Sequence, residues 1–132
     1  MNQEILRIIE QISREKGIEK GILLAGVEAA VLSAAKRPFM VVGSGAFYAR
    51  AWEPLAEFAG LTDVPIVSHI WDRGCIERPT PQYLGVTNDE LNHAMPMLSR
   101  ADLVLVVGAR IDYRLWCGQP PHFPVGAKVV RV

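Results

Sequence analysis

The chain has 132 residues, of which 50% are hydrophobic and 21% are charged, and its formal net charge is zero. This length accommodates one domain of ordinary size. The apolar content and the balanced charge indicate neither a disordered chain nor a surface that coats a polyanion, so no nucleic-acid partner is expected. The apolar runs are shorter than a membrane span, the start resembles no signal peptide, and two cysteines make no disulfide framework. A cytoplasmic protein without a membrane partner is therefore expected.

The first 37 residues predict a hairpin of two helices. The first helix has isoleucines at the spacing of one helix face, namely Ile5, Ile8, Ile9 and Ile12. The second helix would carry apolar side chains across 22–34. It should end before Pro38, because the residue before a proline is pushed out of the helical conformation.

The stretch from Pro38 to Gly45 is the feature around which the rest of the chain is organised. Its apolar run before a glycine pair favours a strand buried on both faces of a parallel sheet. The turn Gly43-Ser44-Gly45 permits a positive φ and leads to a predicted helix N-terminus near Tyr48, where a nucleotide phosphate could bind. A dinucleotide fingerprint has a third glycine that this turn lacks, so a plain tight turn is the alternative.

Downstream of this turn, helical and strand patterns alternate. Residues 49–59 predict a helix closed by Gly60, and residues 64–68 predict a short strand. Glycine, proline, arginine and aspartate mark 70–81 as a loop before a short strand at 83–86.

The C-terminal third predicts one helix and two strands. Thr87 and Glu90 form the pattern of a capping box, which predicts a helix that begins there and that Pro96 could divide. The β-branched and leucine run Leu103–Val107 predicts a second central strand, and residues 128–132 predict a last one.

This alternation predicts an α/β fold with a parallel sheet, whose ligands bind beyond the carboxyl ends of the strands. Beyond the second central strand, the Arg110 guanidinium matches a phosphate and the Asp112 carboxylate could hold ribose hydroxyls. The alternative is a surface ion pair between Arg110 and Asp112, or one with Arg114. The candidate cofactor-binding residues are Gly43, Ser44, Gly45, Gly108, Ala109, Arg110 and Asp112.

The histidines and cysteines do not predict a metal or catalytic site. His69, His93 and His122 show no metal-ligand spacing with one another or with Cys75 and Cys117. A nucleophile pair of Cys75 and His69 is conceivable, but their separation in sequence says nothing about geometry, so structural roles are favoured.

Six segments of the sequence carry a family resemblance. The most specific is Ala101–Arg114, which reads ADLVLVVGARIDYR. The others are Ala35–Pro38, Val42–Ala46, Ile70–Gly74, Gly118–Pro121 and Ala127–Val132. From residue 36 onward, the sequence resembles the central domain of thiamine-diphosphate-dependent enzymes of the acetolactate synthase group.

The resemblance implies a three-layer α/β domain of the DHS-like NAD/FAD-binding type. Some members of this family bind the ADP part of FAD and others bind ADP, so these are the ligands to expect here. The catalytic glutamate and the ligands of thiamine diphosphate and magnesium lie in the flanking domains of full-length members. The chain is therefore expected to be C-terminally truncated, to require no cofactor and to be catalytically inert by itself.

Exposed apolar surface is expected where the neighbouring domains of such an enzyme would pack. Trp71, Tyr113 and Trp116 could stack on a base, although such residues belong more often to a core or a domain interface. The expected partners are therefore the missing enzyme domains or a second copy in a homo-oligomer.

Residues 1–37 are similar to the start of the bacterial transcription factor NusA, through Asn2–Leu6, Glu10–Ile18 and Val27–Arg37. This similarity implies contact with RNA polymerase, so a polymerase-interaction module is an alternative function, and a ligand-free scaffold is another. The expected domains are a NusA-like hairpin at 1–37 and the central domain at 27–132. Both would share the helix 27–37, through a natural or engineered fusion.

Overall fold

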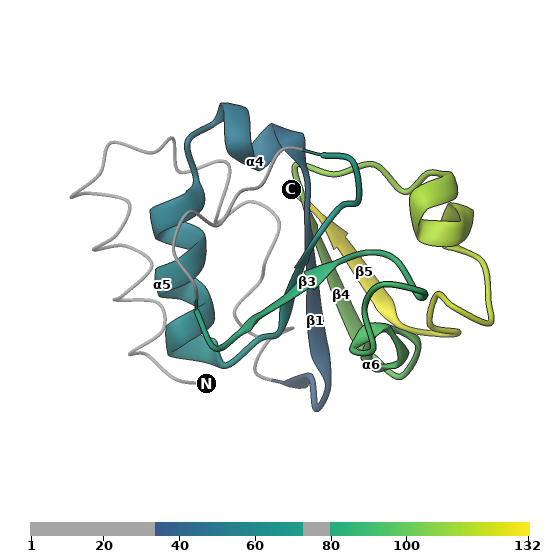
Figure 1. Ribbon diagram of the computed structural model, residues 1–132. Helices are drawn as coiled ribbons and strands as arrows, with labels where there is room; N and C mark the ends of the chain where they lie inside the picture. The colour runs from purple at the N-terminus through teal and green to yellow at the C-terminus, as the bar shows by residue number, and fades with distance from the viewer. Residues whose placement is uncertain (1–33, 73–79) are drawn as a thin grey trace.

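The computed structural model describes residues 34–72 and 80–132, which fold around one sheet (Figure 1). The strands are β1 (Pro38–Val42), β2 (Ile66–Ser68), β3 (Tyr83–Val86), β4 (Leu103–Val107) and β5 (Lys128–Arg131). The helices are α4 (Ser44–Tyr48), α5 (Trp52–Thr62), α6 (Met95–Ser99) and the 3-10 helix η1 (Tyr113–Gly118).

The five strands are all parallel and lie in the order β3-β2-β1-β4-β5. The central pair is β1 and β4, with Val41 opposite Val106. All residues of β4 are buried, as are all those of β1 after Pro38. Their unbroken apolar runs explain this placement, because a strand covered on both faces needs no polar alternation. The prediction of two central strands in an α/β fold is confirmed.

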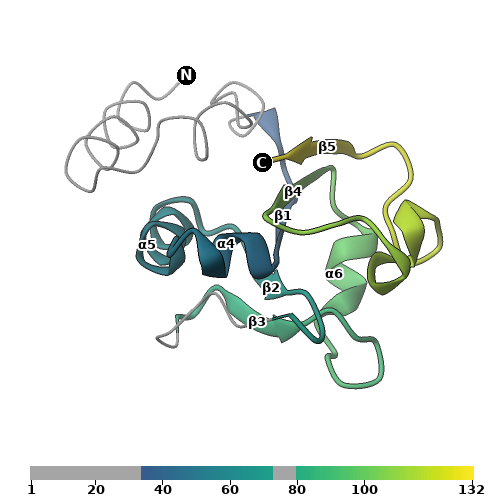
Figure 2. The ribbon, with the colours of Figure 1, turned by 90° about the horizontal axis from the view of Figure 1, so that it is seen from above.

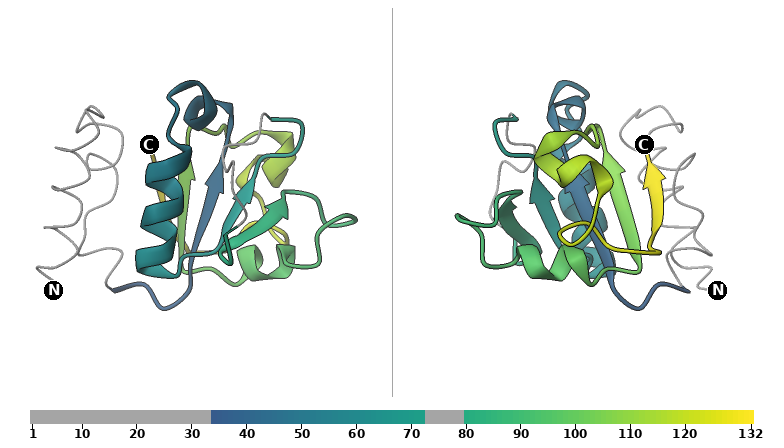
Figure 3. Two further views of the ribbon diagram at one scale, coloured as in Figure 1. Left: turned by 60° about the vertical axis from the view of Figure 1, so that its left-hand side comes forward. Right: turned by 90° about the vertical axis from the view of Figure 1, so that its right-hand side faces the viewer.

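Helices cover both faces of the sheet, which gives three layers (Figures 2 and 3). One core cluster joins the sheet to α5 and includes Met40, Leu105, Leu55 and Phe58. The other joins the opposite face to α6 and η1 and includes Phe39, Val104, Leu98 and Leu115. Successive residues of β1 thus enter different cores, as the pleat of a strand requires.

The strand order changes direction at the centre of the sheet. From β1 the chain moves outward to β2 and β3, and it then returns to place β4 on the other side of β1. The turns after β1 and β4 therefore meet at the carboxyl edge, where such sheets have their ligand crevice.

The helices after β1 differ from the sequence prediction. Helix α4 begins at Ser44 rather than near Tyr48. Helix α5 runs through Gly60 and ends at Thr62. The cap residue that follows, Asp63, has a left-handed φ of 54°, and its N–H donates to the carbonyl of Ala59. The predicted stop at Gly60 was wrong because aspartate tolerates this conformation and can end a helix in place of glycine.

The predicted capping box at Thr87 is also wrong. The hydroxyl of Thr87 accepts a hydrogen bond from the amide of Ile70 instead of capping a helix. The side chain of Asn88 accepts from the amides of Glu90 and Leu91, which forms a local turn that competes with a helix. Helix α6 begins later, at Met95. Pro96 lies in its first turn, where the missing N–H costs nothing.

The predicted hairpin, apart from residues 34–37, lies outside the described residues. So do Cys75 and most of the predicted loop 70–81. Within 34–72 and 80–132, no helix is long and apolar enough to cross a membrane.

Candidate functional site

The turns after β1 and β4 lie directly against each other at the carboxyl edge of the sheet. The amide of Gly45 donates to the carbonyl of Gly108 over 2.9 Å. Gly108 has a φ of 57°, and a Cβ there would lie 2.3 Å from the amide nitrogen of Ala46. Only glycine fits this approach of two backbones, so the glycines that the sequence marked as a candidate site are required for packing.

The amides of the first turn are already bonded within the protein. The amide of Ser44 donates to the Asp72 carboxylate over 2.9 Å, and the amide of Ala46 donates to the carbonyl of Gly43. Together with Gly45, these are the groups that would have to meet a diphosphate. In this arrangement they do not fit that role, and nucleotide binding stays a prediction.

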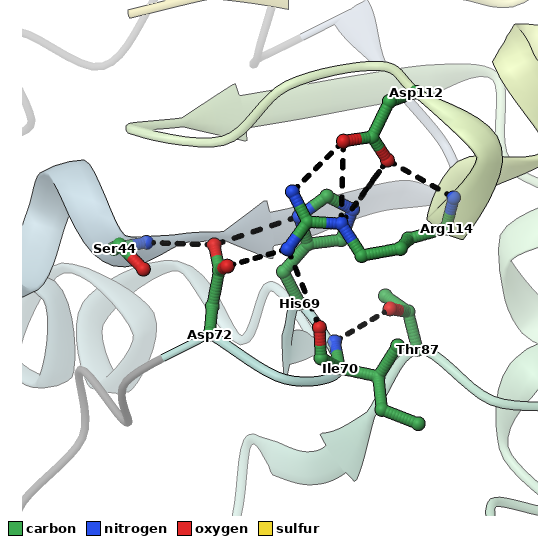
Figure 4. A network of polar contacts seen from close by, with 7 residues as sticks. All are labelled: Ser44, His69, Ile70, Asp72, Thr87, Asp112 and Arg114. Carbon is green, nitrogen blue, oxygen red and sulfur yellow. Dashed lines mark hydrogen bonds and ion pairs between the residues drawn. The ribbon is translucent and has the colours of Figure 1, made fainter.

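Four charged or titratable side chains meet beside this turn, and we call them the charged cluster: His69, Asp72, Asp112 and Arg114 (Figure 4). The Arg114 guanidinium lies between the two carboxylates. Its Nη2 is 2.8 Å from Asp112 Oδ2, and its Nη1 is 2.5 Å from Asp72 Oδ1. The cluster therefore connects the segments that follow β1, β2 and β4.

The Asp112 carboxylate also determines the local backbone. It accepts from the backbone amide of Arg114 over 3.0 Å and begins η1 as its cap residue. The hydrogen bonds from Arg114 hold the pKa of Asp112 at about 2. Burial raises the pKa of Asp72, but hydrogen bonds from the Ser44 amide and from Arg114 outweigh it and leave that pKa below its usual value. Both groups are therefore carboxylates at neutral pH.

His69 follows β2 and is fully buried beside the two carboxylates. Its Nδ1 is 3.6 Å from Asp72 Oδ2, and its Nε2 is 3.8 Å from Asp112 Oδ1. Neither nitrogen has a hydrogen-bond partner among the residues that the structure describes. Burial and the nearby Arg114 guanidinium lower the pKa of His69. The ring is accordingly neutral at pH 7.

The structure separates the arginines that the sequence left as alternatives. Arg114 forms the ion pair with Asp112, whereas Arg110 is exposed and takes no part in the charged cluster. The sequence did not reveal the part played by Asp72, which lies 42 residues before Arg114. Their contact depends on the neighbouring positions of β2, β1 and β4, for which sequence spacing gives no signal.

The candidate aromatic platform is divided in the structure. Trp71 and Tyr113 are exposed by 85% and 74%. Trp116 instead packs against the second core cluster and stacks on His122, with ring centroids 4.6 Å apart. The described residues contain no group of three or more histidine, cysteine, aspartate or glutamate side chains that could hold a metal ion.

A family model described as "Thiamine pyrophosphate enzyme, central domain" matches residues 28–132, and one described as "NusA N-terminal domain" matches residues 4–47. Among curated proteins, the chain is 34% identical over 103 residues to an acetolactate synthase of Mycobacterium avium. It is 32% identical over 102 residues to 2-hydroxyacyl-CoA lyase 1 of Dictyostelium discoideum. Each match covers 77% of this chain but only 16% and 17% of those relatives.

The fold is also similar to that of a solved structure. An X-ray structure described as that of a thiamin diphosphate-dependent enzyme from Mycobacterium smegmatis superposes with a TM-score of 0.61 at 27% sequence identity. The match covers 78% of this chain and 20% of that one. With the family model spanning most of its length, the chain belongs to the central-domain family of thiamine pyrophosphate enzymes.

Proposed function

We propose that this chain acts as the non-catalytic central domain of a thiamine-diphosphate-dependent enzyme related to the acetolactate synthases and 2-hydroxyacyl-CoA lyases. The observation that carries the proposal is the charged cluster. Its two carboxylates are paired with Arg114, and their pKa values lie below the usual range. A general acid or base works best with a pKa near the working pH. These two carboxylates are therefore suited less to proton transfer than to holding together the segments that follow β1, β2 and β4.

The first test is titration with thiamine diphosphate and magnesium. We expect no saturable heat, because the groups that hold both ligands in this family belong to its flanking domains. A full-length 2-hydroxyacyl-CoA lyase provides the positive control in the same buffer. A dissociation constant below about 100 μM, which corresponds to roughly −5.5 kcal/mol, would contradict the proposal.

We also propose that any nucleotide bound is an adenine nucleotide held at the carboxyl edge, with Arg110 as its main contact. An exposed guanidinium can form charge-assisted hydrogen bonds with a phosphate, each worth about 1.5–3 kcal/mol. Arg110→Ala should therefore weaken ADP binding by roughly 10- to 150-fold in calorimetry.

The matched control for this test is Arg100→Ala, which removes the same charge from the opposite end of β4. It should leave the ADP affinity unchanged. Gly45→Val is unsuitable, because its Cβ would lie 2.8 Å from the Cα of Gly108 and would disturb the turn itself. Equal affinities of the parent and Arg110→Ala proteins would place the nucleotide elsewhere, and no binding at all would favour the ligand-free scaffold.

The match to NusA favours the alternative of a polymerase-interaction module only for the first part of the chain. Residues 38–47 of that match form β1 and most of α4 here. They are therefore already used as the central strand and first turn of the α/β domain. Contact with RNA polymerase through residues 1–37 stays a prediction, and it is compatible with the proposed role of the rest.

A further inference from the structure

The charged cluster contains more negative than positive charge around a buried ring. Two carboxylates face one guanidinium, and the neutral imidazole of His69 lies among them. Among the described residues, Asp72, Asp112 and Arg114 are the charged groups that act on His69. A neutral imidazole has a single N–H, whereas a protonated one has two. Protonation would therefore direct one N–H at each carboxylate.

The oxygens nearest to His69 are already hydrogen-bond acceptors. Asp72 Oδ2 lies 3.6 Å from the ring and accepts the amide of Ser44. Asp112 Oδ1 lies 3.8 Å from the ring and accepts both the backbone amide and Nε of Arg114. Both separations are longer than a hydrogen bond. A protonated His69 could therefore bond these oxygens only if the two carboxylates moved toward the ring and away from the amides that they now accept. The hydrogen bonds that this would weaken are the one that joins the start of α4 to Asp72 and the one that joins the start of η1 to Asp112.

We propose that the charged cluster is a proton-sensitive latch, in which protonation of His69 releases the Ser44 amide and loosens the contact between the segments that follow β1, β2 and β4. The latched arrangement holds His69 in its neutral form. A lower pH therefore favours any arrangement in which the His69 imidazole is more exposed to solvent. This is a property of the fold, and it does not depend on whether the chain binds a nucleotide.

The direction of the pH effect follows from the pKa of His69, which is lowered from its ordinary value of 6.5. The opened state takes up a proton more readily than the latched state. The latch is therefore intact above pH 6.5, and it weakens as the pH falls through the lower pKa of the folded protein. The pKa values of Asp72 and Asp112 lie below 3.8, so both stay ionised at the start of this change.

Amide hydrogen exchange between pH 7.5 and pH 5 tests the proposal. After correction for the intrinsic rate, opening at Ser44 should increase by up to about tenfold per pH unit below pH 6.5. The amide of Leu105, in the fully buried β4, should not follow it. His69→Gln should abolish the pH dependence at Ser44, while His93→Gln and His122→Gln should retain it.

Two outcomes would overturn the latch. One is a pH dependence at Ser44 that persists in His69→Gln or that Leu105 shares in the parent. The other comes from the parent protein alone and does not require the variant to fold. It is an imidazole titration of His69, followed by NMR, with a pKa at or above 6.5.

Discussion

Gly108→Ala should lower the free energy of unfolding by more than about 3 kcal/mol, and this is a large part of the stability of a domain of this size. Two costs combine at this position. The left-handed backbone, with a φ of 57°, costs an alanine about 1–2 kcal/mol. The added Cβ would also lie 2.3 Å from the Ala46 nitrogen and 2.7 Å from the Gly45 carbonyl carbon. Both contacts are with backbone atoms, which no side-chain rotation can relieve.

A comparison of Gly108→Ala with Gly126→Ala by chemical denaturation isolates the cost of the steric overlap between the added Cβ and the backbone. Gly126 also has a positive φ, of 74°, but a Cβ there would have no atom of residues 34–72 or 80–132 within 4 Å. Its substitution should cost only the conformational part, about 1–2 kcal/mol. Equal losses in the two variants would show that the close approach of the turns does not matter to stability.

The central strands could be predicted because the composition of each strand indicates how deeply it is buried. Pro38–Val42 and Leu103–Val107 are unbroken apolar runs that end next to glycine, and a strand buried on both faces has this composition. The meeting of their turns also follows from the sequence once the sheet is taken as parallel. These two features determine most of the fold around the candidate site.

The helix boundaries and the charged cluster could not be predicted, because competing local bonds and distant contacts decide them. Thr87 has the sequence of a helix cap, but the nearby chain after β2 uses its hydroxyl. Nothing in the sequence distinguished His69 from His93 and His122 as a buried residue. Its burial depends on the chain returning after β4 to place Asp112 and Arg114 beside it.

Arg114→Gln should lower the free energy of unfolding by about 2 kcal/mol at pH 7.5. Removing one partner of a buried ion pair leaves the others without compensation and costs up to 3–5 kcal/mol. The side chain of Arg114 is 16% exposed, so water offsets part of that loss. Two carboxylates would then lie close together with no guanidinium between them. Arg110→Gln makes the same change at an exposed arginine four residues earlier, and it should cost less than about 0.5 kcal/mol.

The pH dependence of this loss identifies the ion pairs as its cause. The pKa of Asp112 is about 2 in the folded chain, below its ordinary value of 3.8, and the pKa of Asp72 is lowered as well. Stabilisation by a carboxylate of this kind is present above its unfolded pKa and is lost as the pH falls through its folded pKa. The difference between the parent and Arg114→Gln should therefore persist above pH 4 and shrink toward pH 2. A difference that stays constant over this range would attribute the loss to the packing of the arginine stem, since that contribution does not depend on protonation.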